Sequence, residues 1–77
     1  MNKNTKKELQ EIIDKLGAIG EQLDKISENE QEKFDNLNEG MQAMEKFKKL
    51  EENADNLSEA SSLLEDVVEY IEGCLDE

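Results

Sequence analysis

The sequence contains no proline, histidine, arginine or tryptophan, and it has only three aromatic residues, Phe34, Phe47 and Tyr70. Without histidine, nucleophilic triads, most general acid–base sites and the Glu-x-x-His di-iron motif of helical bundles are excluded. No Gly-Lys-Ser or Gly-Lys-Thr sequence is present to form a phosphate-binding loop. We therefore expect a protein that is not an enzyme, with no catalytic residue, no bound metal and no cofactor.

Long hydrophobic runs and paired cysteines are also missing. No stretch of 18 apolar residues is present, so no transmembrane span is expected. The N-terminal lysines precede no hydrophobic segment of the kind that a signal peptide needs. The single cysteine, Cys74, cannot form an internal disulfide, which is typical of a reducing compartment. We expect a cytoplasmic protein without membrane binding.

Positive charge is scarce, and it is unevenly distributed. The formal net charge is −12. Residues 1–26 hold five lysines and five acids, so the whole of this charge lies in residues 27–77. Ten acids follow Lys49 without another lysine. This distribution argues against direct nucleic-acid binding, and against binding to an anionic membrane, through the C-terminal half.

A helical hydrophobic pattern fills the first part of the chain. Thr5 and Glu8 match a capping box, which predicts a helix over about 5–35. Two rows of apolar residues repeat every seven positions and nothing alternates with period two, so a strand is excluded. The rows are Leu9, Leu16 and Leu23, and Ile12, Ile19 and Ile26.

A second helical pattern predicts a helix over about 41–73. Its clearest heptad row is Leu50, Leu57, Leu64 and Ile71. Asn53 falls on the seam, and the small residues Ala54, Ala60 and Ser61 narrow it, which favours a close approach of a neighbouring helix. Gly17 and Gly20 of the first helix have two equally weighted interpretations: close approach by a partner backbone, or weak points that a long helix tolerates.

Turn-forming residues separate the two patterns at about 36–40. Asn36, Asn38 and Gly40 cluster within five positions, a composition typical of turns. We expect a single all-α domain over 1–77, folded as a two-helix antiparallel hairpin. Phe34 and Leu37 are expected to face inward at the turn. The predicted hinge consists of Phe34, Asp35, Asn36, Leu37 and Gly40.

A hairpin of this size has little apolar material to bury. The chain has only eighteen Leu, Ile, Val and Phe residues, and two helices cover only one side of each apolar row. We therefore expect a homo-oligomer, most simply a dimer that forms a four-helix bundle. The predicted oligomer seam comprises Leu9, Ile12, Leu16, Ile19, Leu23, Ile26, Leu50, Leu57, Leu64 and Ile71.

Acidic residues dominate the second helix away from its apolar row. They are Glu51, Glu52, Asp55, Glu59, Glu65, Asp66, Glu69 and Glu72. Such a surface usually serves solubility alone, and it is also a possible partner-binding face. Two functions are therefore considered. The first is a non-enzymatic, oligomerising helical module that binds an unidentified protein. The alternative is an acidic inhibitor or nucleic-acid mimic that acts on a basic enzyme.

The central segment resembles one shared by small, acidic, functionally uncharacterised helical proteins of phages, prophages and gut bacteria. That segment reads approximately E-x-E-A-F-D-N-L-P-E-G-L-Q-x-S-E-R-G, and the likeness covers roughly residues 28–72. The matching residues are Glu30, Glu32, Phe34, Asp35, Asn36, Leu37, Glu39, Gly40 and Gln42. The resemblance implies a helical hairpin of phage or mobile-element origin in the cytoplasm of a bacterium or a phage-infected host cell. It makes a host or phage enzyme the expected target of the inhibitor alternative, and it implies no activity of the protein's own.

Two departures from this pattern affect the second helix. Asn38 stands in place of the proline, and Met44-Glu45-Lys46-Phe47 replaces the S-E-R-G segment. The replaced segment would cap the second helix and supply an arginine. Without it, we expect the second helix to begin near Met41, with Met44 and Phe47 joining the core.

Overall fold

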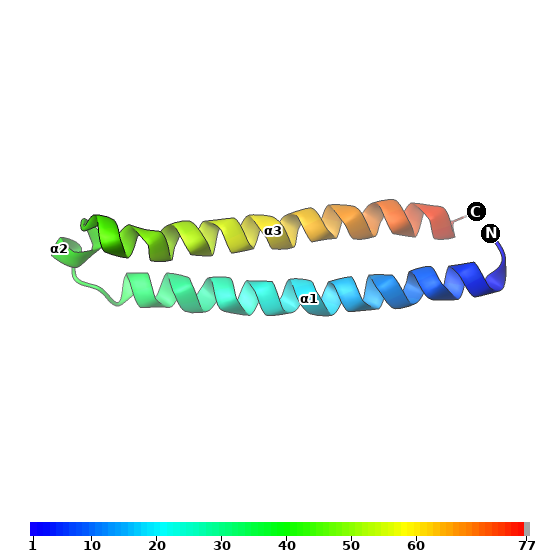
Figure 1. Ribbon diagram of the computed structural model, residues 1–77, viewed down its shortest axis with the longest axis horizontal. Helices are drawn as coiled ribbons and strands as arrows, with labels where there is room; N and C mark the ends of the chain where they lie inside the picture. The colour runs from blue at the N-terminus through cyan, green and yellow to red at the C-terminus, as the bar shows by residue number, and fades with distance from the viewer. Residues whose placement is uncertain (77) are drawn as a thin grey trace.

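Two long antiparallel helices make up nearly all of the protein. The structure, a computed structural model, describes residues 1–76 and contains α1 (Lys3–Asp35), α2 (Glu39–Gln42) and α3 (Glu45–Leu75). The helices α1 and α3 lie side by side along their whole length, and α2 forms the connection at one end (Figure 1). The molecule measures 59 × 15 × 14 Å. The expected all-α class and the two-helix hairpin are confirmed.

Asparagine caps the first helix one turn from its expected start. The side-chain oxygen of Asn2 accepts a hydrogen bond from the backbone N–H of Thr5 at 2.8 Å, so Asn2 and not Thr5 is the N-cap. Asparagine suits this position because its short amide satisfies an N–H that has no partner within the helix. From there α1 runs without a break to Asp35, the residue at which the sequence pattern predicts its end.

The second helical segment begins differently from the sequence expectation. Asn38 accepts a hydrogen bond from the N–H of Met41 at 2.9 Å, and this cap starts the four-residue helix α2. The extended backbone of Met44 then separates α2 from α3 (ψ 134°), so the long helix begins at Glu45 and not near Met41. Met44 is exposed instead of buried, whereas Phe47 is half-buried, with the ammonium of Lys46 4.9 Å from its ring centre.

The hinge closes one end of the hairpin. Phe34 is 9% exposed and Leu37 is half-buried, as expected for residues that face inward. The side-chain amide of Gln42 donates hydrogen bonds to the carbonyl oxygens of both residues, each at 3.1 Å. These two bonds tie α2 to the end of α1, so the turn is fixed by an amide side chain as well as by apolar contact.

Hydrogen bonds from two serines connect the long helices. The hydroxyl of Ser61 donates to the carbonyl oxygen of Gly20 at 3.3 Å, and the hydroxyl of Ser27 donates to the carbonyl oxygen of Ala54 at 2.7 Å. A serine hydroxyl lies two bonds from its Cα, so these contacts bring the backbones close together. Gly20 and Ser27 are seven residues apart, as are Ala54 and Ser61, and the two contacts therefore share one antiparallel register.

Small side chains form the most deeply buried part of this interface. Ala54 and Ser61 are 3% and 5% exposed, and Phe34 is the one other buried residue within residues 1–76. The expected close approach of a helix is confirmed at Ala54 and Ser61, where the neighbour is α1 of the same chain, whereas Ala60 is only half-buried. No large side chain in this range is fully buried, so one hairpin leaves most of its apolar side chains partly in contact with solvent.

The ten residues of the predicted oligomer seam fall into two groups. Seven of them are half-buried along the helix pair: Leu9, Leu16, Leu23, Leu50, Leu57, Leu64 and Ile71. The remaining three, Ile12, Ile19 and Ile26, are 44–49% exposed. Beside the leucines, the residues of α1 that face α3 are Ile13, Gly20 and Ser27. Each of them comes one position after an isoleucine of the predicted seam. The packed stripe is thus rotated away from the isoleucine row.

Candidate functional site

A groove runs along one flank of the helix pair, beside the Gly20–Ser61 contact. Its volume is about 440 Å³. The apolar floor comprises Ile13, Leu16, Leu64 and Val68, and the small residues Gly17, Gly20 and Ser61 leave the space above it open. Five carboxylates complete the lining: Glu21, Asp24, Glu65, Glu69 and Glu72. We call this feature the acidic groove.

The groove exists because Gly17 and Gly20 of α1 have no side chains to fill it. A Cβ atom built on Gly17 would meet nothing within 4 Å, and one built on Gly20 would lie 3.7 Å from the Ser61 hydroxyl. Larger residues at these two positions would project into the space between the helices. Gly20 lies against the facing helix, which agrees with the interpretation of close approach. Gly17 borders open space, so no other helix of the hairpin approaches it.

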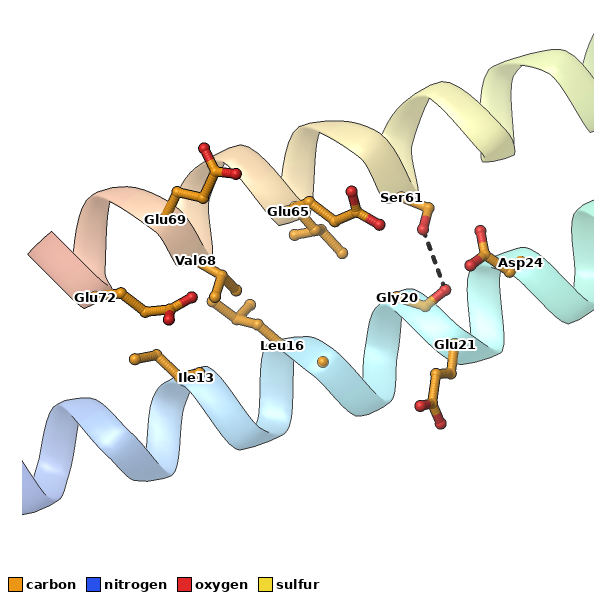
Figure 2. Close-up of a pocket in the computed structure, with 12 residues that line it drawn as sticks. Ile13, Leu16, Gly20, Glu21, Asp24, Ser61, Glu65, Val68, Glu69 and Glu72 are labelled. Carbon is orange, nitrogen blue, oxygen red and sulfur yellow. Dashed lines mark hydrogen bonds between the residues drawn. The ribbon is translucent and has the colours of Figure 1, made fainter.

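The carboxylates differ in direction, as Figure 2 shows. Glu65 and Glu72 from α3 and Asp24 from α1 extend over the space between the helices. Glu69 and Glu21 point outward from their helices. Within residues 1–76, none of these five forms an ion pair with a lysine. The groove therefore combines an apolar floor with uncompensated negative charge along both edges.

The opposite flank of the helix pair is apolar. Helical periodicity places Ile12, Ile19 and Ile26 on the side of α1 that faces away from Gly17 and Asp24. In an antiparallel pair, the matching flank of α3 carries Leu63 and Val67, which are 55% and 43% exposed. We call these five residues the isoleucine face. It differs from the acidic groove in both charge and shape, so the two flanks suit different partners.

The predicted partner-binding acids occupy more than one part of α3. All eight are exposed. Glu65, Glu69 and Glu72 line the acidic groove, and the other five lie outside it: Glu51, Glu52, Asp55, Glu59 and Asp66. Among these five, Glu52 pairs with Lys49 at 3.5 Å. Two groove carboxylates from α1, Glu21 and Asp24, were not part of the prediction, because they belong to a segment with no net charge.

Within residues 1–76, neither the carboxylates nor Cys74 forms a metal site. Within residues 1–76, no group of three or more Cys, Asp or Glu side chains is arranged to hold a metal ion. Cys74 is half-buried, and its thiol donates to the carbonyl oxygen of Tyr70 at a sulfur–oxygen distance of 3.7 Å. Over the same residues, no helix combines the length and the apolar content needed to cross a membrane.

Comparisons with protein-family models, curated proteins and solved structures gave no match to this chain. The resemblance of residues 28–72 to acidic phage proteins therefore stays a prediction.

Proposed function

We propose that this protein is a helical assembly module that pairs with a second copy of itself through the isoleucine face. Two hairpins joined in this way form a four-helix bundle. The observation that carries the proposal is the exposed row of Ile12, Ile19 and Ile26, repeated every seven residues along α1. A continuous apolar row at this spacing is typical of helix–helix interfaces.

The surface area supports a second copy as the occupant of this face. A compact monomer of 8.8 kDa exposes about 4,800 Å². The hairpin exposes 5856 Å², so it carries an excess of roughly 1,100 Å² on that scale. A stable protein interface covers about 800 Å² on each partner. The excess surface of the elongated hairpin is therefore comparable to the area that one partner of a dimer covers.

Charge also favours self-association on this flank. The three isoleucines lie within residues 1–26, where five lysines balance five acids. Two copies that meet along this part of α1 do not oppose surfaces of one sign. Eight of the ten acids after Lys49 lie in α3, so a contact made through the acidic surface of α3 would bring together two surfaces of the same sign.

Replacing the central isoleucine tests the proposal. In Ile19→Gln, each chain of the dimer loses a buried apolar side chain, so we expect the dimer dissociation constant to rise roughly tenfold or more. Size-exclusion chromatography with light scattering measures the change. The matched control is Gly17→Gln, which places the same residue on the opposite flank of the same helix and is expected to leave the dimer intact. Equal effects of the two substitutions would contradict the assignment of the isoleucine face.

A further inference from the structure

We propose that the acidic groove binds an amphipathic helix from a partner protein, with lysine or arginine residues along both edges of its apolar face. This binding site is independent of self-association, because the isoleucine face lies on the opposite flank. Helices commonly dock in this manner, with apolar anchors in a groove and charged residues at its edges.

The shape of the groove suits a helix. Its apolar floor includes Leu16 and Val68, which can contact the apolar face of a docked helix. The open space at Gly17 lets a partner backbone come close, because no side chain stands in its way. Along α1 the groove extends from Ile13 to Asp24, which corresponds to roughly 17 Å at 1.5 Å per residue. A partner helix of about three turns covers this length.

The charge of the groove selects a cationic partner. Asp24 on one edge and Glu65 and Glu72 on the other extend over the open space, and none of them forms an ion pair within residues 1–76 (Figure 2). A lysine or arginine at each edge of a docked helix would bring opposite charge to these carboxylates. Contact with the floor would at the same time remove apolar surface from water.

Other occupants fit less well. A second copy docked face to face on the groove would oppose five carboxylates to five carboxylates. The phosphates of a nucleic acid would meet the same repulsion. The carboxylates also form no cluster, within residues 1–76, that is suited to a metal ion. A basic amphipathic helix supplies both the apolar contact and the opposite charge.

The test uses a synthetic amphipathic peptide of leucine and lysine, about four helical turns long, with a fluorescent label. Its affinity for the unaltered protein is measured by fluorescence anisotropy. In the groove variant, Asp24→Asn, Glu65→Gln and Glu72→Gln are combined, and we expect the dissociation constant to rise roughly tenfold, because three charge pairs are lost.

A matched control removes the same number of charges outside the groove. It combines Asp55→Asn, Glu59→Gln and Asp66→Asn on the exposed surface of α3, and we expect the dissociation constant to change less than about twofold. Equal losses in the groove and control variants would overturn the proposal, because they would show that total charge alone attracts the peptide. Undetectable binding to the unaltered protein at micromolar concentration would overturn it as well.

Filling the groove provides a test that does not alter charge. Gly17→Gln places a side chain in the open space, and we expect it to weaken peptide binding severalfold while circular dichroism shows an unchanged helix content. Unchanged affinity in this variant would overturn the proposal that the partner helix binds in the groove at Gly17. Ile19→Gln is expected to bind the peptide as the unaltered protein does, even where it abolishes the dimer, so failure of self-association and failure of groove binding are distinguishable.

Discussion

The hydroxyl of Ser61 donates a hydrogen bond to the backbone carbonyl oxygen of Gly20, 3.3 Å away on the facing helix. Ser61 is polar, yet it is only 5% exposed. Its small size lets it fit between the helices. The contact shows that the two helices meet through small residues at this level, and that backbone atoms of α1 form part of the interface. A side chain larger than serine would have to push against α1 or turn into the acidic groove that Ser61 borders.

Enlarging Ser61 is therefore expected to destabilise the hairpin. We predict that Ser61→Leu lowers the free energy of unfolding by about 1–3 kcal/mol, because the longer side chain would have to push against α1 or turn into the acidic groove, and the hydrogen bond to Gly20 is lost. Thermal denaturation followed by circular dichroism measures the change. Ser62→Leu is the control, since Ser62 is exposed, and its effect should stay within about 0.5 kcal/mol. Similar effects of the two substitutions would contradict the close helix contact.

The two groove glycines are expected to be sites of stabilisation. Alanine has the higher helix propensity by about 1 kcal/mol. A Cβ at position 17 meets nothing within 4 Å, and a Cβ at position 20 reaches ordinary contact with the Ser61 hydroxyl at 3.7 Å. We predict that Gly17→Ala and Gly20→Ala each raise the free energy of unfolding by up to about 1 kcal/mol in thermal denaturation. A loss of stability in Gly20→Ala would show that the helices tolerate no added atom there.

Phe34 is expected to contribute more to stability than any other aromatic residue. It is buried beside the turn, whereas Tyr70 is 83% exposed. We predict that Phe34→Ala lowers the free energy of unfolding by about 3 kcal/mol, through lost burial and the cavity left behind. Tyr70→Ala, the matched control, should change it by less than about 0.5 kcal/mol. Chemical denaturation measures both values, and equal losses would show that Phe34 does not anchor the turn.

Added salt is expected to stabilise the protein. The net charge is −12, and ten acids follow Lys49 without a balancing lysine, so the folded state concentrates negative charge along α3. Sodium chloride screens this repulsion, and the melting temperature should rise with its concentration. The variant that combines Asp55→Asn, Glu59→Gln and Asp66→Asn should respond less steeply. A melting temperature that falls or stays constant with salt would contradict this interpretation.

Much of the fold could be predicted from the sequence, because its local signals agree with one another. Apolar residues recur at helical spacing on both sides of the turn, and α1 ends at Asp35, where the turn residues begin. The caps were harder to predict. Asn2 and Asn38 both accept hydrogen bonds from N–H groups three residues on, but competing signals at Thr5 and Met41 pointed to different starts.

The packing face was harder to predict than the helices themselves. Leu9, Leu16 and Leu23 can pair with either Ile12 or Ile13 on one helical stripe, and only the partner helix determines which stripe is covered. Gly20 and Ser27 belong to the covered stripe, but small or polar residues contribute no hydrophobic signal. Their spacing of seven, repeated by Ala54 and Ser61, was the available sign of close packing.

The acidic groove depends on this same packing. It lines one groove with Asp24 of α1 and with Glu65 and Glu72 of α3, although the sequence separates these residues widely and gives only α3 an excess of acids. Sequence reasoning identified the α3 acids as a possible binding surface. The α1 carboxylates Glu21 and Asp24 were not predicted, because residues 1–26 contain as many lysines as acids. In the structure, however, these two carboxylates form no ion pair with those lysines.

The most direct test of self-association through the isoleucine face is the mass of the unaltered protein in solution. Sedimentation equilibrium at micromolar concentration is expected to give twice the chain mass of 8.8 kDa, because the isoleucine face joins two hairpins. Ile19→Gln under the same conditions should shift the equilibrium towards the single chain. A helical protein that sediments at 8.8 kDa throughout the micromolar range would contradict the proposed assembly.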